Sequence, residues 1–271
     1  MKTDNDHICE IFPPSQFVIE IDTWYNKESE GPRSTYSIYD IEKRQATRSH
    51  YSSMILLFIV FDKTNDILPS ISIEQIKRGL RITGTEILQK MEEVAKKLFI
   101  KTISISDGSM IEIKKDKIAK ISIPLAPLSI LSSGRSWYNK MGYVTDNQEE
   151  VDTCNAMIIR ESMGSFIDRI RNHVHCVGTN KPRIHQYITA VKNKLIRHLT
   201  DEDLNQPYLQ GSLDQPVHEF FSEIKERMKQ GLIDAVVLSR IALLLSKVED
   251  YDIIKVFDVE TTLYRQIGQM K

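Results

Sequence analysis

The stretch from Ile123 to Tyr143 constrains the fold most, because its spacing and its turn chemistry agree. Pro127 suits the first turn of a helix, where its missing amide costs no hydrogen bond. Gly142 suits the left-handed position just past a helix end. Apolar side chains recur between them roughly on one helical face: Leu128, Leu131, Tyr138 and Met141. The pattern predicts a helix that begins near Pro127 and ends at Gly142, with a strand beginning at Tyr143.

Alternation of apolar and polar residues predicts strands before this stretch. Three of them lie in the first 62 residues, at 16–24, 34–40 and 51–61. The third is an almost continuous apolar run, as expected of a strand that is covered on both faces. Residues 101–107 predict a further strand, and 110–114 with 118–123 predict a short hairpin. Residues 1–15 are expected to be a lead-in that Pro13-Pro14 closes.

One helix in this half of the chain has a clear start signal. Thr83 and Glu86 have the S/T-x-x-E spacing of a capping box, in which each side chain bonds the backbone amide of the other. Apolar residues then follow at helical spacing: Ile87, Leu88, Met91, Val94, Ala95 and Leu98. A helix over 83–99 is predicted.

Beyond residue 145 the predicted elements are helices, at 151–170, 184–199, 218–230 and 232–248, with loops at 173–181 and 204–216. The fold class is therefore α/β (α+β), with a mixed sheet flanked by helices over 1–147 and a mainly helical domain over 148–271. The apolar run Leu232–Leu245 is broken by Asp234 and Arg240. It predicts a buried helix, or a docking helix for another protein chain, and no membrane span.

The composition is that of an ordinary globular protein, with 41% hydrophobic and 27% charged residues and a formal net charge of −1. This net charge predicts no bulk attraction to nucleic acid or membranes. Cys9, Cys154 and Cys176 are far apart and form no C-x-x-C pair, which argues against a disulfide framework or a zinc ribbon. The first ten residues lack the apolar core of a signal peptide. A reducing, cytoplasmic setting is expected.

Other clusters suggest further roles. His173 and His175 would share one face of a strand and could supply two metal ligands, but no third or fourth ligand has a familiar spacing, so a loop without metal is predicted. The region 160–198 is rich in Lys and Arg, which indicates either a solvated helix face or a nucleic-acid contact. Gly134-Arg135-Ser136 lies near Lys140, but the G-x-x-x-x-G-K-[ST] phosphate loop is absent.

The sequence Tyr138-Asn139-Lys140-Met141-Gly142-Tyr143 resembles the Tyr-x-x-x-Gly-Phe/Tyr element of the GNAT superfamily of N-acetyltransferases. The upstream order of strands, Gly-containing loop, helix and strand is also similar, so the resemblance covers about residues 51–145. The longer S-W-Y-N-K-M-G-Y is similar to a segment in uncharacterised proteins of large DNA viruses. A viral origin would imply the host cytoplasm or the virion as the location.

The resemblance implies an acyl-CoA-dependent N-acyltransferase. Arg81, Gly84 and Thr85 would bind the pyrophosphate of acetyl-CoA at a helix N-terminus, and Tyr138 would protonate the departing thiolate. Glu86 departs from the family pattern, which has a small residue there.

Each of these residues also has a purely structural interpretation. The capping box explains Thr83–Glu86 without a ligand, and Tyr138 could simply pack inward. No general base is assigned, because Asp62 and Asp107 are each also suited to cap a turn. An insertion between Asp107 and Pro124 departs from the family and could reshape the acceptor cleft. The alternative is a non-catalytic interaction protein whose helical half binds a partner.

Overall fold

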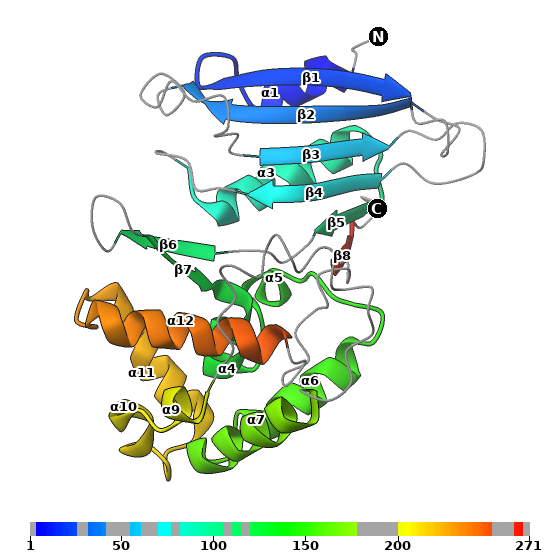
Figure 1. Ribbon diagram of the computed structural model, residues 1–271. Coiled ribbons are helices and arrows are strands. Elements are labelled where there is room, and N and C mark those ends of the chain that lie inside the picture. The colour runs from blue at the N-terminus through cyan, green and yellow to red at the C-terminus, as the bar shows by residue number, and fades with distance from the viewer. Residues whose placement is uncertain are drawn as a thin grey trace. The chain divides into compact units, whose positions relative to one another are not determined.

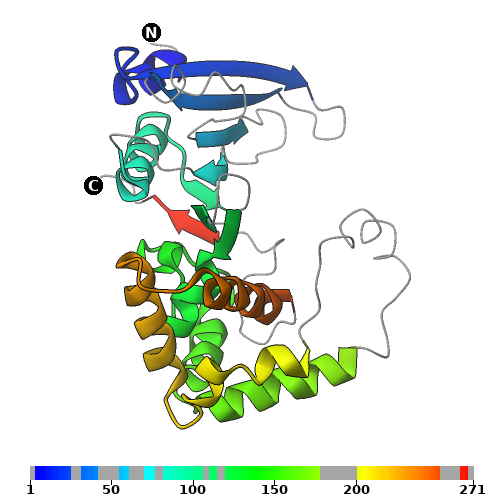
Figure 2. The same ribbon diagram turned by 60° about the vertical axis from the view of Figure 1, so that its left-hand side comes forward.

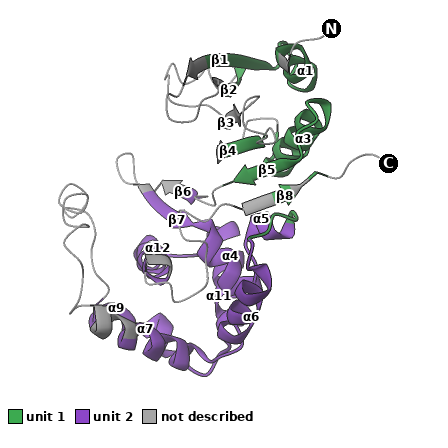
Figure 3. Ribbon diagram, turned by 90° about the vertical axis from the view of Figure 1, so that its right-hand side faces the viewer, with its two compact units in different colours: residues 1–107, 141–145, 259–271 green, residues 108–140, 146–258 purple. Residues whose placement is uncertain are grey.

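A computed structural model describes residues 4–25, 32–41, 55–60, 70–76, 82–105, 110–114, 120–177, 200–250 and 263–267 (Figures 1 and 2). The chain forms two compact units (Figure 3). Unit 1 comprises residues 1–107, 141–145 and 259–271, and unit 2 comprises 108–140 and 146–258. The units therefore do not follow a single boundary at residue 147, because the chain leaves unit 1, returns to it briefly, and ends in it.

Unit 1 is built on a six-stranded mixed sheet in the order β1-β2-β3-β4-β5-β8. The first four strands form an antiparallel meander, β5 runs parallel to β4, and β8 runs antiparallel to β5. The strands predicted at 16–24, 34–40, 51–61 and 101–107 are confirmed, while β4 and β8 were not predicted. Their bounds are β1 Phe17–Tyr25, β2 Pro32–Asp40, β3 Ile55–Val60, β4 Ser70–Ile76, β5 Thr102–Ile105 and β8 Leu263–Gln266.

The parallel pair β4 and β5 is connected through helix α3 (Gly84–Lys97), as a parallel pair requires a crossover. The apolar face of α3 is buried, as its sequence predicted, and α3 packs against both strands. Helix α1 (Asp4–Ile11) packs against α3 and buries Ile8 and Ile11, so the lead-in expected before Pro13 contains a helix.

Unit 2 combines a hairpin with a set of helices. Its centre is α4, an almost wholly buried helix against which α11 and α12 pack, and α12 also covers β7. The hairpin and the helices predicted near 218–230 and 232–248 are confirmed. The elements are β6 Met110–Lys114, β7 Lys120–Pro124, α4 Leu125–Ser133, α5 Trp137–Lys140, α6 Gln148–Ile158, α7 Met163–Val177, α9 Asp201–Leu204, α10 Pro207–Gln210, α11 Val217–Lys229 and α12 Ala235–Asp250.

The single helix predicted between Pro127 and Gly142 is wrong. Helix α4 ends at Gly134, which adopts φ 81° and donates its amide to the carbonyl of Ile130. Ser136 and Asn139 then cap a new turn, because each side chain bonds the backbone amide of the other. Tyr143 begins no strand. The next residue, Val144, is a single β-bridge residue and does not belong to a strand.

Three predictions for the helical half also fail. The helix predicted over 151–170 is two helices, α6 and α7, because the carbonyls of Ile159 and Glu161 accept bonds from the first amides of α11. The loop predicted at 173–181 is helical as far as Val177, the end of α7. Within the segment 204–216, expected to be a linker, lies the short helix α10. The helix predicted at 184–199 lies outside the described residues.

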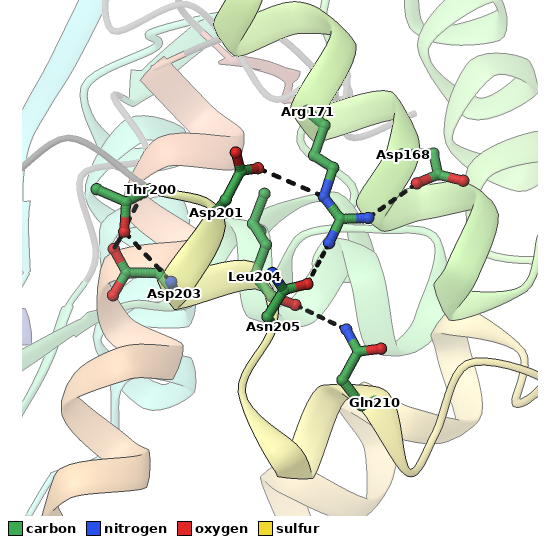
Figure 4. A network of polar contacts seen from close by, with 8 residues as sticks. All are labelled: Asp168, Arg171, Thr200, Asp201, Asp203, Leu204, Asn205 and Gln210. Carbon is green, nitrogen blue, oxygen red and sulfur yellow. Dashed lines mark hydrogen bonds and ion pairs between the residues drawn. The ribbon is translucent and has the colours of Figure 1, made fainter.

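A polar network joins α7 to α9 in unit 2 (Figure 4). Arg171 of α7 contacts Asp168 at 3.0 Å, Asn205 at 2.6 Å and Asp201 at 3.7 Å. Thr200 and Asp203 form a second capping box at the start of α9. Asp203 is buried and also pairs with Arg240 of α12, so the short α9 is fixed by both neighbouring helices.

Candidate functional site

The start of helix α3 is the site that the sequence predicted for a phosphate group. Gly84 and Thr85 occupy the first turn, where their amides have no intrahelical carbonyl to bond. The amide of Thr83 donates instead to the Glu86 carboxylate at 2.7 Å, and the amide of Glu86 donates to the Thr83 hydroxyl at 3.3 Å. The predicted capping box is therefore confirmed, and it leaves the amides of Gly84 and Thr85 for a ligand.

Glu86 determines which ligand can approach these amides. Hydrogen bonds from the Thr83 amide and hydroxyl lower the pKa of the Glu86 carboxyl, so the group is ionised at neutral pH. A helix N-terminus stabilises one anion well, and Glu86 already supplies that charge. A pyrophosphate beside it would meet a like charge, so the donor set at this helix end does not fit the acetyl-CoA that the resemblance implies.

The remaining predicted site residues lie either outside the described residues or in the other unit. Arg81, Asp62 and Asp107 lie outside the described residues. Tyr138 belongs to α5 of unit 2, whereas Gly84 and Thr85 belong to unit 1. Its side chain is only 3% exposed, and its ring lies 4.8 Å from the ring of Trp137. This burial agrees with the interpretation of Tyr138 as a packing residue.

The second half of the GNAT-like element lies in unit 1 and is held by Arg265 of β8. The Arg265 guanidinium donates to the carbonyl of Met141, pairs with Glu92 of α3 at 2.8 Å, and lies 6.0 Å from the ring centroid of Tyr143. Gly142 adopts φ 86°, as expected for a left-handed position. Tyr143 is fully buried. Residues 141–143 are thus tied to both α3 and β8 through one side chain.

Unit 1 contains a cavity of about 810 Å³ beside the first turns of α3. This volume falls within the range of small-molecule sites, roughly 300–1,000 Å³. Its walls come from the α1–β1 connection, the end of β2, and the polar face of α3. The lining residues are Ser15, Gln16, Phe17, Asp40, Ile41, Ile82, Glu86, Gln89, Lys90, Glu92, Glu93 and Lys96.

The cavity is acidic. Four carboxylates line it against two lysines, so carboxylates outnumber ammonium groups along its walls. Lys90 donates to the carbonyl of Ile11 at 2.7 Å and lies over the ring of Phe12, and Glu92 is paired with Arg265. The other lining carboxylates are Asp40, Glu86 and Glu93. A cationic ligand suits such a cavity better than a phosphate. Sequence reasoning missed this site, because its walls are distant along the chain.

The comparisons with known proteins leave the family open. No family model, no curated protein and no solved structure matches the chain significantly. Across the described part of the chain, no three His, Cys, Asp or Glu side chains are grouped so that they could hold a metal ion. The same residues include no helix with the length and apolar character needed to cross a membrane.

Proposed function

We propose that unit 1 is a degenerate member of the acyl-CoA N-acyltransferase fold that binds a small cationic ligand. The position of Glu86 carries this proposal, because its ionised carboxylate lies at the helix N-terminus and would repel a pyrophosphate there. The resemblance around Tyr138–Tyr143 and the parallel β4–α3–β5 unit with the antiparallel β8 beside it support the fold.

The chemistry of the acidic cavity supports an amine as the ligand. A protonated amine would gain attraction from Asp40, Glu86 and Glu93, which line one cavity in unit 1. Asp40 is buried, so its charge acts in a medium where electrostatic interactions are stronger than in water. The ligand is therefore expected to be a primary amine or diamine.

An active N-acyltransferase is the second candidate, favoured by the two first-turn amides of Gly84 and Thr85. In that case acetyl-CoA would supply the acyl group, and these amides of unit 1 would hold its pyrophosphate. The amine held in the acidic cavity would be the acyl acceptor. The two candidates differ in whether the wild-type chain binds acetyl-CoA.

One substitution separates the candidates, because Glu86→Gln keeps a capping acceptor and removes the charge. Calorimetry should detect no acetyl-CoA binding to the wild-type chain, and measurable binding to Glu86→Gln. Binding of 1,5-diaminopentane should change in the opposite direction and weaken in Glu86→Gln. The matched control is Glu93→Gln, which makes the same charge change further along α3 and should not gain acetyl-CoA binding.

Binding of acetyl-CoA to the wild-type chain would overturn the degenerate interpretation and favour the enzyme. If the affinity for the diamine is equal in the wild-type chain, Glu86→Gln and Glu93→Gln, the acidic cavity is not the site where the diamine binds.

The protein-partner role expected for the helical half stays a proposal for unit 2. Leu232 in the connection between α11 and α12 is 68% exposed, and Val236 in the first turn of α12 is 57% exposed; a partner would cover these apolar side chains. The nucleic-acid role considered for 160–198 also stays a prediction, since residues 178–199 lie outside the described part of the chain.

A further inference from the structure

Two lysines from different helices meet at the last turn of α4 in unit 2. Lys140 of α5 donates to the hydroxyl of Ser133 at 2.6 Å, and Lys225 of α11 lies 3.5 Å from the hydroxyl of Ser129. Ser129 and Ser133 are four residues apart in one helix, so their Cβ atoms lie about 5–6 Å apart on the same face. The two ammonium groups are therefore close neighbours.

Neither ammonium group has an ion-pair partner among the described residues. Carboxylates of α11 and α6 are engaged by other cations, since Glu223 and Glu226 of α11 pair with Arg227 and Lys229, and Asp152 of α6 pairs with Arg135. Burial lowers the pKa of both Lys140 and Lys225, and the charge of Lys140 lowers that of Lys225 further. The pair thus carries positive charge that no carboxylate of the described residues neutralises through an ion pair.

Capping of the helix C-terminus does not account for the pair. The carbonyl of Ser129 accepts bonds from the hydroxyls of Ser132 and Ser133, and that of Ile130 accepts from the Gly134 amide. The carbonyl of Ser132 accepts from the hydroxyl of Ser222 at 3.0 Å. The lysines bond the serine hydroxyls and not these carbonyl oxygens, so their ammonium groups retain donors for another acceptor.

We propose that Lys140 and Lys225 bind a phosphate group of a small ligand, such as a diphosphate. Two neighbouring ammonium groups offer charge and several donors to a tetrahedral oxyanion. The Ser133 hydroxyl positions Lys140 and is not itself a donor to the anion, because its proton is donated to the carbonyl of Ser129. Ser129 and Lys225 form a partly buried base, while Ser133 and Lys140 are exposed, so an anion can enter from solvent. The site lies wholly within unit 2 and does not depend on the ligand proposed for unit 1.

The sequence alone did not predict this site. The segment Ser133–Lys140 lacks the spacing of a known phosphate loop, and Lys225 joins it from 85 positions further along the chain.

Calorimetry of the full chain with inorganic pyrophosphate tests the proposal. The variants Lys140→Met and Lys225→Met should each weaken pyrophosphate binding at least about tenfold, since each removes charge-assisted hydrogen bonds. Lys229→Met is the matched control, because Lys229 lies on α11 one turn from Lys225 and pairs with Glu226. It should leave the affinity within about twofold. Circular dichroism confirms that each variant folds.

A second measurement does not depend on substitution. Acetic anhydride labelling followed by mass spectrometry should show that pyrophosphate protects Lys140 and Lys225 and leaves Lys229 labelled. The proposal is overturned if pyrophosphate does not bind, if all three variants lose affinity equally, or if Lys229 is protected as strongly as the other two. It is also overturned if binding requires a single-stranded oligonucleotide and pyrophosphate neither binds nor competes, since the ligand would then be nucleic acid.

Discussion

Replacement of Asp203 by Ala should strongly destabilise unit 2. The Asp203 side chain is 2% exposed and pairs with Arg240, whose side chain is 22% exposed. Its other oxygen accepts bonds from the Thr200 amide at 3.0 Å and the Thr200 hydroxyl at 2.9 Å. Asp203→Ala therefore removes an ion pair and half of a capping box together, and it leaves the Arg240 charge partly buried without this partner.

The magnitude follows from the burial of the two partners. Breaking a buried ion pair by removing one member costs roughly 3–5 kcal/mol. The lower end applies here, because the guanidinium of Arg240 keeps some contact with water, and about 3 kcal/mol is expected. Asp203→Asn keeps the acceptor for Thr200 and loses only the charge, so about 2 kcal/mol is expected. Total stabilities are about 5–15 kcal/mol, which makes either loss easy to measure.

Urea unfolding followed by tryptophan emission can report on unit 2 alone. The chain has two tryptophans. Trp24→Phe removes the one in β1 of unit 1 and leaves Trp137 of unit 2 as the probe. The control is Asp168→Ala, since Asp168 is 68% exposed and its ion pair with Arg171 should contribute less than about 0.5 kcal/mol.

A double-mutant cycle then isolates the ion pair itself. Combining Asp203→Ala with Arg240→Met should be less destabilising than the sum of the single changes, by about 1–2 kcal/mol. If Asp203→Ala costs no more than Asp168→Ala, the buried pair does not stabilise unit 2 and the reasoning fails.

Four further predictions concern changes of one residue at a time. Thr83→Ala should destabilise α3 by about 1 kcal/mol in urea unfolding. Because the folded-state pKa of Glu86 is lowered, its stabilising contribution is present above the ordinary glutamate pKa and is lost as the pH falls through the folded-state value. The melting temperature of the wild-type chain should therefore fall more than that of Glu86→Gln between neutral pH and about pH 3. Gly142→Ala should cost about 1–2 kcal/mol through its positive φ alone, and Gly134→Ala more, since its new Cβ would also lie 3.3 Å from a side-chain carbon. Spectrophotometric titration should show that Tyr208→Phe removes a phenol that ionises at about pH 12, because burial raises the pKa of Tyr208 to about 12.

The elements that the sequence predicted well are those fixed by local interactions. Helix α3 has its capping box and its apolar face within sixteen residues of chain, so both could be read without the rest of the fold. Strand β8 could not, because Leu263–Gln266 is four residues long and becomes a strand by pairing with the open edge of β5. Strand β4 has an alternating sequence of its own, but the capping box and the apolar periodicity of α3 that follow it are stronger signals.

The break at Gly134 shows a different limit of sequence reasoning. Gly134 and Gly142 are both in the left-handed conformation that suits a residue just past a helix end. Either glycine could end a helix that starts near Pro127. The reciprocal bonds between Ser136 and Asn139 decide the outcome, because they begin a second short helix after Gly134. A cap formed by only two side chains is a weak sequence signal, and the helix start is recognised only from the geometry of the two hydrogen bonds.

The candidate site divides in the same way between local and distant contributions. Gly84 and Thr85 were identified correctly as first-turn residues of α3, because the helix start is encoded locally. The acidic cavity combines Phe17, Asp40 and Glu93, which lie on three separate elements. Its excess of carboxylates could not be anticipated from a chain whose net charge is −1, since it arises where these elements meet.

The GNAT-like element itself is accounted for by packing at both of its ends. Tyr138 is buried against Trp137 in unit 2, and Tyr143 is buried in unit 1, where Arg265 bonds the preceding carbonyl of Met141. The burial of both aromatic residues is thus accounted for whether or not a ligand binds, and it does not by itself indicate acyl transfer. Glu86 bears on the chemistry more directly, because it stands where the resemblance implies a small residue and its capping geometry keeps a negative charge at the helix start.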